Sequence, residues 1–113
     1  MNPIPFETLD WNTVESTAHP GEKGMAYWKT KNYGGLRIRM VEYSSDYLAD
    51  HWCEKGHILF CIKGELHTEL EDGSVHTLKE NMSYHVSDHM SKHQSSTVGG
   101  AKLFIIDGEF LQL

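Results

Sequence analysis

The sequence predicts a small all-β domain in which short antiparallel strands form a sandwich or a barrel. Its 113 residues supply one hydrophobic core, because a chain of this length cannot divide that core between two domains. From residue 25 onward, short alternating or apolar runs follow one another, separated by turn residues. No segment in that region keeps a helical pattern of apolar residues for three turns.

The first 24 residues differ from the rest. They contain all three prolines, and their apolar residues fit neither a helical nor a strand period. We therefore expect an irregular N-terminal arm over residues 1–24 that packs on the domain. One short helical turn is expected within residues 13–18, ended by Pro20.

Residues 25–113 are interpreted as a single barrel domain. The run from 36 to 43 alternates, with Ile38 and Met40 on one face and Arg37 and Arg39 on the other. The run from 57 to 63 is almost continuously apolar, which is typical of a strand covered on both faces. An Asp-Gly pair at 72–73 between two alternating runs predicts a hairpin. Strands are expected at 25–30, 36–43, 57–63, 66–70, 74–78, 82–87, 93–97 and 101–107.

Composition and charge exclude several classes of function. Ten Lys and Arg against 16 Asp and Glu give a net charge of −6, so a nucleic-acid partner is not expected. The longest apolar runs reach about a quarter of the length of a membrane helix, so no membrane partner is expected either. The segment Met1 to Glu7 has neither the basic start nor the apolar stretch of a secretory signal, which predicts a cytoplasmic protein. Gly-rich phosphate loops, nucleophile elbows and paired CxxC motifs are absent, so no organic cofactor is expected.

Histidine is the unusual component. Five of the eight histidines fall within 43 residues: His51, His57, His85, His89 and His93. If residues 51–53 are a strand, His51 and Cys53 project to the same face, and Trp52 faces away. An imidazole nitrogen and a sulfur can then reach one ion, with His57 after a short turn and His93 from a distant strand. Imidazole with thiolate suits zinc, iron, nickel or copper.

The segment from His51 to Gly64 resembles the first motif of the cupins, H-x-H-x3-E-x6-G. Cys53 stands at the second histidine, His57 replaces the glutamate, and Gly64 keeps the turn glycine. The second cupin motif ends in a histidine ligand, which His93 matches. More narrowly, residues 49–57 resemble the small cupins named for an Asp-His-Cys-Trp motif, with Trp and Cys here in the opposite order.

This resemblance implies a jelly-roll barrel (double-stranded β-helix) that holds one divalent transition metal: zinc, iron, nickel, manganese or copper. The implied ligands are His51, His57 and His93, with Cys53 as the fourth. It further implies oxygenase, isomerase or lyase chemistry on a small polar molecule, and a homodimer, because small cupins commonly pair through their N-terminal strands.

Several alternatives stay open from the sequence. The protein is alternatively a non-catalytic module whose pocket binds or senses a metal or a small ligand. A third interpretation is a redox-sensing thiol at Cys53. Catalytic residues are unknown, because Glu54, Tyr84 and His85 are all candidates for an acid or base, and His85 is equally a candidate ligand. Packing or surface roles are expected for the remaining thiol and three further histidines: Cys61, His19, His67 and His76.

Overall fold

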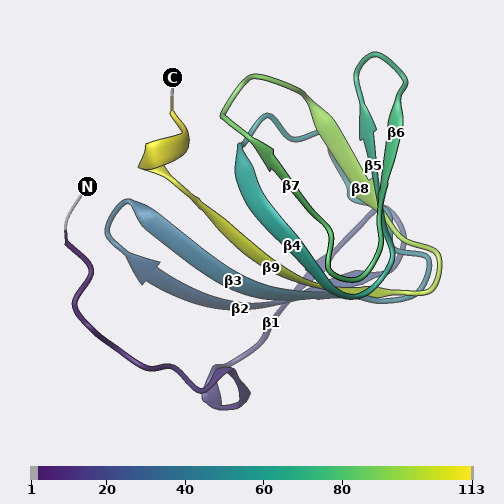
Figure 1. Cartoon of the computed structure of the whole chain (residues 1–113). Helices are drawn as coiled ribbons and strands as arrows, with labels where there is room; N and C mark the ends of the chain where they lie inside the picture. The colour runs from purple at the N-terminus through teal and green to yellow at the C-terminus, as the bar shows by residue number, and fades with distance from the viewer. Residues whose placement is uncertain (1–2, 113) are drawn as a thin grey trace.

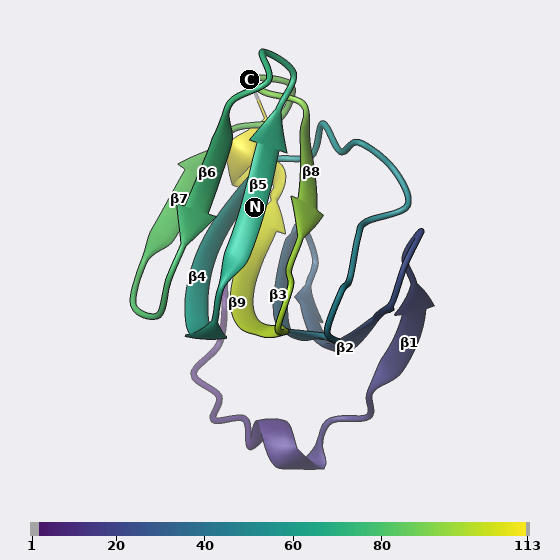
Figure 2. The same cartoon turned by 90° about the vertical axis from the view of Figure 1, so that its right-hand side faces the viewer.

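The computed structural model describes residues 3–112 and contains two facing antiparallel sheets (Figures 1 and 2). The larger sheet has six strands in the order β1-β2-β3-β9-β4-β7, and the smaller has three in the order β6-β5-β8. The strands are β1 (Thr17–Pro20), β2 (Met25–Tyr33), β3 (Leu36–Tyr43), β4 (His57–Gly64), β5 (Leu66–Leu70), β6 (Val75–Leu78), β7 (Ser83–Val86), β8 (His93–Ser96) and β9 (Ala101–Gly108). The predicted all-β architecture is confirmed.

Within residues 3–112, the helical content is limited to two short 3-10 segments, η1 (Trp11–Thr13) and η2 (Glu109–Leu111). Asp10 caps η1, because its carboxylate accepts a hydrogen bond from the Asn12 backbone N–H at 3.0 Å. Among residues 3–112, no helix has the length and hydropathy that a membrane span requires.

The N-terminal segment contributes a strand that the sequence pattern did not predict. The expected turn within residues 13–18 forms slightly earlier, as η1, and β1 then pairs with β2 in the register Thr17↔Trp28 to Pro20↔Met25. Pro20 sits at the end of this edge strand, where its missing N–H costs no ladder hydrogen bond. Pairing with a neighbouring strand therefore outweighs the weak local pattern.

The core lies between the two sheets. Leu59, Leu66 and Leu103 are at most 1% exposed, and Cys61 is fully buried among them. This confirms the packing role expected for Cys61.

The strands of the large sheet turn one face inward and one outward. The register aligns Ile58, Ile106 and Ile38 across β4, β9 and β3 in an outward row, followed by Phe60, Phe104 and Met40. Strand β4 alternates between buried and exposed residues, so the expectation that it is covered on both faces is wrong within this chain. The arginines of β3, in contrast, share the inward face with buried Val41.

The turn after β4 depends on Gly64, whose φ is +80°. A Cβ added there would collide with the carbonyl oxygen of Gly100, so this position requires glycine for both conformation and space. The turn joins the large sheet to β5 of the small sheet, and so places the two layers face to face.

Candidate metal centre

The first residue of the site, Cys53, lies on the long connection between β3 and β4. It is tied to the start of β8, because the N–H of Cys53 donates to the carbonyl of His93 at 2.8 Å and the N–H of His93 donates back at 3.0 Å. This bridge fixes the two residues opposite each other, although 39 positions separate them in the sequence.

His57 opens β4 and its side chain points into the interior, with the residue only 8% exposed. Its Nδ1 donates a hydrogen bond to Oδ2 of Asp107 on β9, at 3.1 Å. A carboxylate accepts this bond, so the proton sits on Nδ1 and leaves Nε2 with its lone pair.

His93 is 3% exposed, and its ring lies 5.4 Å from that of His57, between centroids. Its Nδ1 donates to the carbonyl oxygen of Ser91 at 3.0 Å. A carbonyl oxygen only accepts hydrogen bonds, so His93 also carries its proton on Nδ1. The lone pair of its Nε2 is then available to a metal.

One ligand atom each from Cys53, His57 and His93 forms a group in which every pair lies within 4.8 Å. Zinc–nitrogen bonds are about 2.0–2.1 Å and zinc–sulfur bonds about 2.3 Å, so two donors on one ion are at most about 4.4 Å apart. A small inward adjustment brings the three onto one ion. The two imidazoles and the thiol therefore fit a divalent transition metal.

The electrostatics favour the thiolate that such a metal needs. The neighbouring His57 side chain lowers the pKa of Cys53 and outweighs the opposing effect of burial. The backbone N–H of Lys55 supports the same charge by donating to the sulfur at 3.3 Å.

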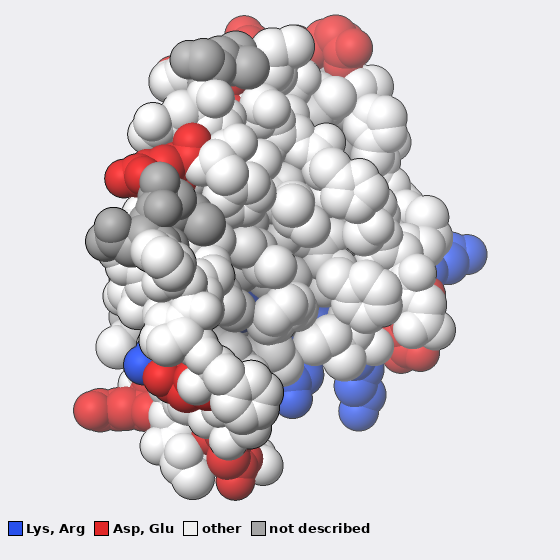
Figure 3. Space-filling view, turned by 60° about the vertical axis from the view of Figure 1, so that its left-hand side comes forward, with Lys and Arg blue, Asp and Glu red and all other residues white. Residues whose placement is uncertain are grey.

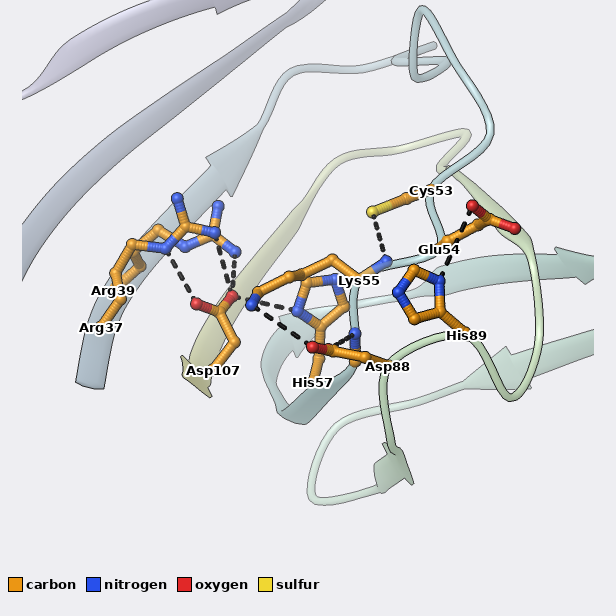
Figure 4. A network of polar contacts seen from close by, with 10 residues as sticks. Arg37, Arg39, Cys53, Glu54, Lys55, His57, Asp88, His89 and Asp107 are labelled. Carbon is orange, nitrogen blue, oxygen red and sulfur yellow. Dashed lines mark hydrogen bonds and ion pairs between the residues drawn. The ribbon is translucent and has the colours of Figure 1, made fainter. Parts of the chain in front are cut away.

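Behind His57, a buried ion network holds its ring (Figure 4). Arg37 donates to both oxygens of Asp107, at 2.9 and 3.0 Å, and Arg39 donates to Oδ2 at 2.9 Å. Burial works against an ionised Asp107, which is 1% exposed, but the hydrogen bonds from His57 and Arg37 and the nearby guanidinium charges hold its pKa well below the usual range.

His51 does not join the three-residue group. Residues 51–53 form no strand and have only the isolated bridge at Cys53, so the strand expected there is absent and its alternation does not apply. The side chain of His51 is 71% exposed, and its Nδ1 lies 2.6 Å from Oδ1 of Asp50. His51 does line the rim of the cavity that contains the other three.

The other candidates from the sequence are distributed around the site. Tyr84 lines the cavity beside His93, with 6.1 Å between ring centroids. His85 is exposed and its Nε2 lies 2.9 Å from the Ser83 hydroxyl, so it is outside the group of three. Glu54 lies 3.8 Å from His89, and both side chains are largely exposed.

Asp107, Arg37 and Arg39 were missed by the motif analysis. A signal was available, because Asp107 continues the inward alternation of the otherwise apolar β9. A charged residue at a core position needs a partner of opposite charge, and the arginines of the neighbouring strand supply it.

Solved structures with the same arrangement of strands identify the fold. An RmlC-like cupin from Shewanella frigidimarina superimposes with a TM-score of 0.73 at 15% identity, covering 92% of this chain and 91% of its own. Ectoine synthase from P. lautus gives 0.73 at 13% identity, with coverages of 96% and 80%. This chain has the cupin fold.

A third cupin-like structure is that of HppE, described as an iron(II) form with an alternative substrate. It gives a TM-score of 0.73 at 15% identity and covers 90% of this chain and 60% of its own. No family model matches the sequence, and a comparison with curated proteins finds no match.

The cupin barrel explains where the group of three lies. Cys53, His57 and His93 come from a loop and from both sheets, and they meet in an interior cavity of about 190 Å³. A second cavity of about 560 Å³, between β7 and the β5–β6 hairpin, shares Tyr84 and His93 with it. Tyr84 and His93 thus lie between the two cavities, next to the candidate metal centre.

Proposed function

We propose that this cupin holds one divalent transition metal through Cys53, His57 and His93, and that the metal binds or acts on a small polar molecule. The observation that carries the proposal is the convergence of the three ligand atoms within 4.8 Å. Three protein ligands leave coordination positions open for a substrate, which distinguishes such a site from a closed structural one.

The metal would supply Lewis acidity or redox chemistry, according to its identity: zinc, iron, nickel, manganese or copper. The chain's own residues prepare the site. Asp107 holds the His57 ring and its proton, and the Ser91 carbonyl does the same for His93. Trp28, Tyr84 and Ile105 add aromatic and aliphatic surface to the cavity wall.

Elemental analysis of the purified protein tests the proposal, with each ligand replaced in turn. We expect about one metal per chain in the parent and loss of metal in His57→Ala and His93→Ala, because affinity depends steeply on the number of ligands. His51→Ala should retain metal, since its exposed ring lies outside the group of three. His67→Ala is the matched control, on the β5–β6 hairpin. Equal metal content in all four variants would contradict the site.

We also propose that two copies of the chain associate as a homodimer through the outer face of the large sheet. Ile58, Phe60 and Ile62 are each 37–38% exposed there. Figure 3 shows a broad uncharged area on this side of the molecule, with Lys, Arg, Asp and Glu around its edge. An uncharged apolar face is complementary to itself, as the symmetric contact of a homodimer requires.

A further inference from the structure

The cavity in which Cys53, His57 and His93 meet is lined by three cationic side chains and, among the described residues, by no carboxylate. Arg37, Arg39 and Lys55 all line it. The two guanidinium groups share a single carboxylate, Asp107, and the Lys55 ammonium lies 3.7 Å from Asp88. One guanidinium charge therefore has no carboxylate of its own among residues 3–112.

Arg39 is a buried cation in the wall of this cavity. It is 5% exposed, and its Nη2 is occupied by Asp107. Its Nε has no hydrogen-bond partner among the described residues, although it is fully buried. Buried guanidinium donors without partners are costly, and an anion in the cavity that Arg39 lines would offset part of that cost.

The surroundings of Arg39 favour an anion rather than a neutral molecule. Its guanidinium lies over the Trp28 ring, 4.4 Å from the centroid, which orients the planar donor fork. Leu59 and Ile105 line the same cavity. A charge pair beside buried side chains is stronger than one in water.

Size narrows the class of anion. The cavity has a volume of about 190 Å³, which suits a small molecule. This space admits a carboxylic acid of a few carbon atoms, whose carboxylate forms short, charge-assisted hydrogen bonds with a guanidinium group.

We propose that the substrate or ligand of this cavity is a small organic acid whose carboxylate binds Arg39. This proposal deepens the proposed function. It rests on that function only for the part of the ligand that faces the metal held by Cys53, His57 and His93. The Arg39 contact itself depends only on the charges and the unpartnered donor described above.

Succinate is a suitable probe, with succinamide as its neutral analogue of nearly equal shape. Both are titrated calorimetrically into the zinc-loaded full chain, and the Nε–H resonance of Arg39 is followed by NMR. We expect succinate to bind at least tenfold more tightly than succinamide and to shift the Arg39 resonance. Arg39→Met should weaken succinate binding at least tenfold, compared in protein loaded with zinc to the same content as the parent.

Lys31→Met is the matched control, because it removes one positive charge from the adjacent strand β2, where Lys31 pairs with Glu7 outside the cavity. It should bind succinate like the parent. Equal binding of succinate and succinamide, or parental affinity in Arg39→Met, would overturn the proposal. So would inorganic phosphate binding more tightly than succinate through Arg39, since the ligand class would then be wrong. If the chain takes up no metal but metal-free protein binds succinate through Arg39, the metal proposal fails and this one stands.

Discussion

The backbones of Cys53 and His93 exchange two hydrogen bonds, which places two of the three candidate ligands opposite each other. The bridge involves main-chain atoms only, so a change of either side chain leaves the other in place. Replacing the Cys53 side chain therefore tests its role as a metal ligand without removing the backbone bridge.

For Cys53→Ser, we expect metal affinity to fall by at least tenfold while the fold is kept, because the hydroxyl is a much poorer ligand than a thiolate for a soft transition metal. A competition titration with a chromogenic zinc chelator measures the change. Cys61→Ala is the control. It empties a fully buried core position, so it should lower the melting temperature and leave zinc affinity unchanged. Parental zinc affinity in Cys53→Ser would make Cys53 a packing residue.

The ion network at Asp107 should be essential to stability. Asp107→Asn leaves Arg39 with an uncompensated buried charge, and breaking a buried ion pair in this way costs about 3–5 kcal/mol. Urea denaturation of the metal-free protein measures this free energy. Glu7→Gln breaks the exposed pair with Lys31 and should cost less than about 1 kcal/mol. Similar costs for the two variants would show that the network contributes little.

Gly64 should tolerate no side chain. Gly64→Ala combines a left-handed backbone with a collision against the Gly100 carbonyl. Gly73 also has a positive φ, of +86°, but nothing lies near its added Cβ. Gly73→Ala therefore measures conformational strain alone, about 1–2 kcal/mol, and Gly64→Ala should cost clearly more. Thermal unfolding of both variants makes the comparison, and equal losses would argue against the collision.

Phe60→Glu should convert a dimer to a monomer, because it places a charge in the middle of the outward apolar rows. Multi-angle light scattering at tens of micromolar protein measures the mass. Val98→Glu is the control, since Val98 is 71% exposed on the loop between β8 and β9, away from these rows. A parent mass near 13 kDa would rule out the dimer.

Much of the strand layout could be predicted from local patterns. Strands β3 and β5 have the expected bounds, and the Asp-Gly hairpin joins β5 to β6 as expected. These elements follow from alternation and turn chemistry, which are local properties. Strand β1 depends on a partner strand instead, and its own residues carry little pattern.

The candidate site could be predicted only in part, and for a physical reason. His57 and His93 open strands, so their positions follow from the strand bounds. His51 and Cys53 lie on a loop, where the alternation of a strand does not apply. The alternation of β3 separates two faces but does not say which one is buried, and the buried face is the one that contains the arginines. Only the partner Asp107, far along the chain, explains why that face is buried.

The place of Trp28 in the barrel gives the protein a built-in optical reporter. Trp28 lines the interior cavity against Arg39, whereas Trp11 packs on Phe104 and Trp52 is 38% exposed on the loop. Of the three indoles, only one therefore adjoins a bound molecule or metal. A chain with Trp11→Phe and Trp52→Phe would show tryptophan emission from that indole alone, so occupancy of the cavity could be followed by fluorescence without any added label.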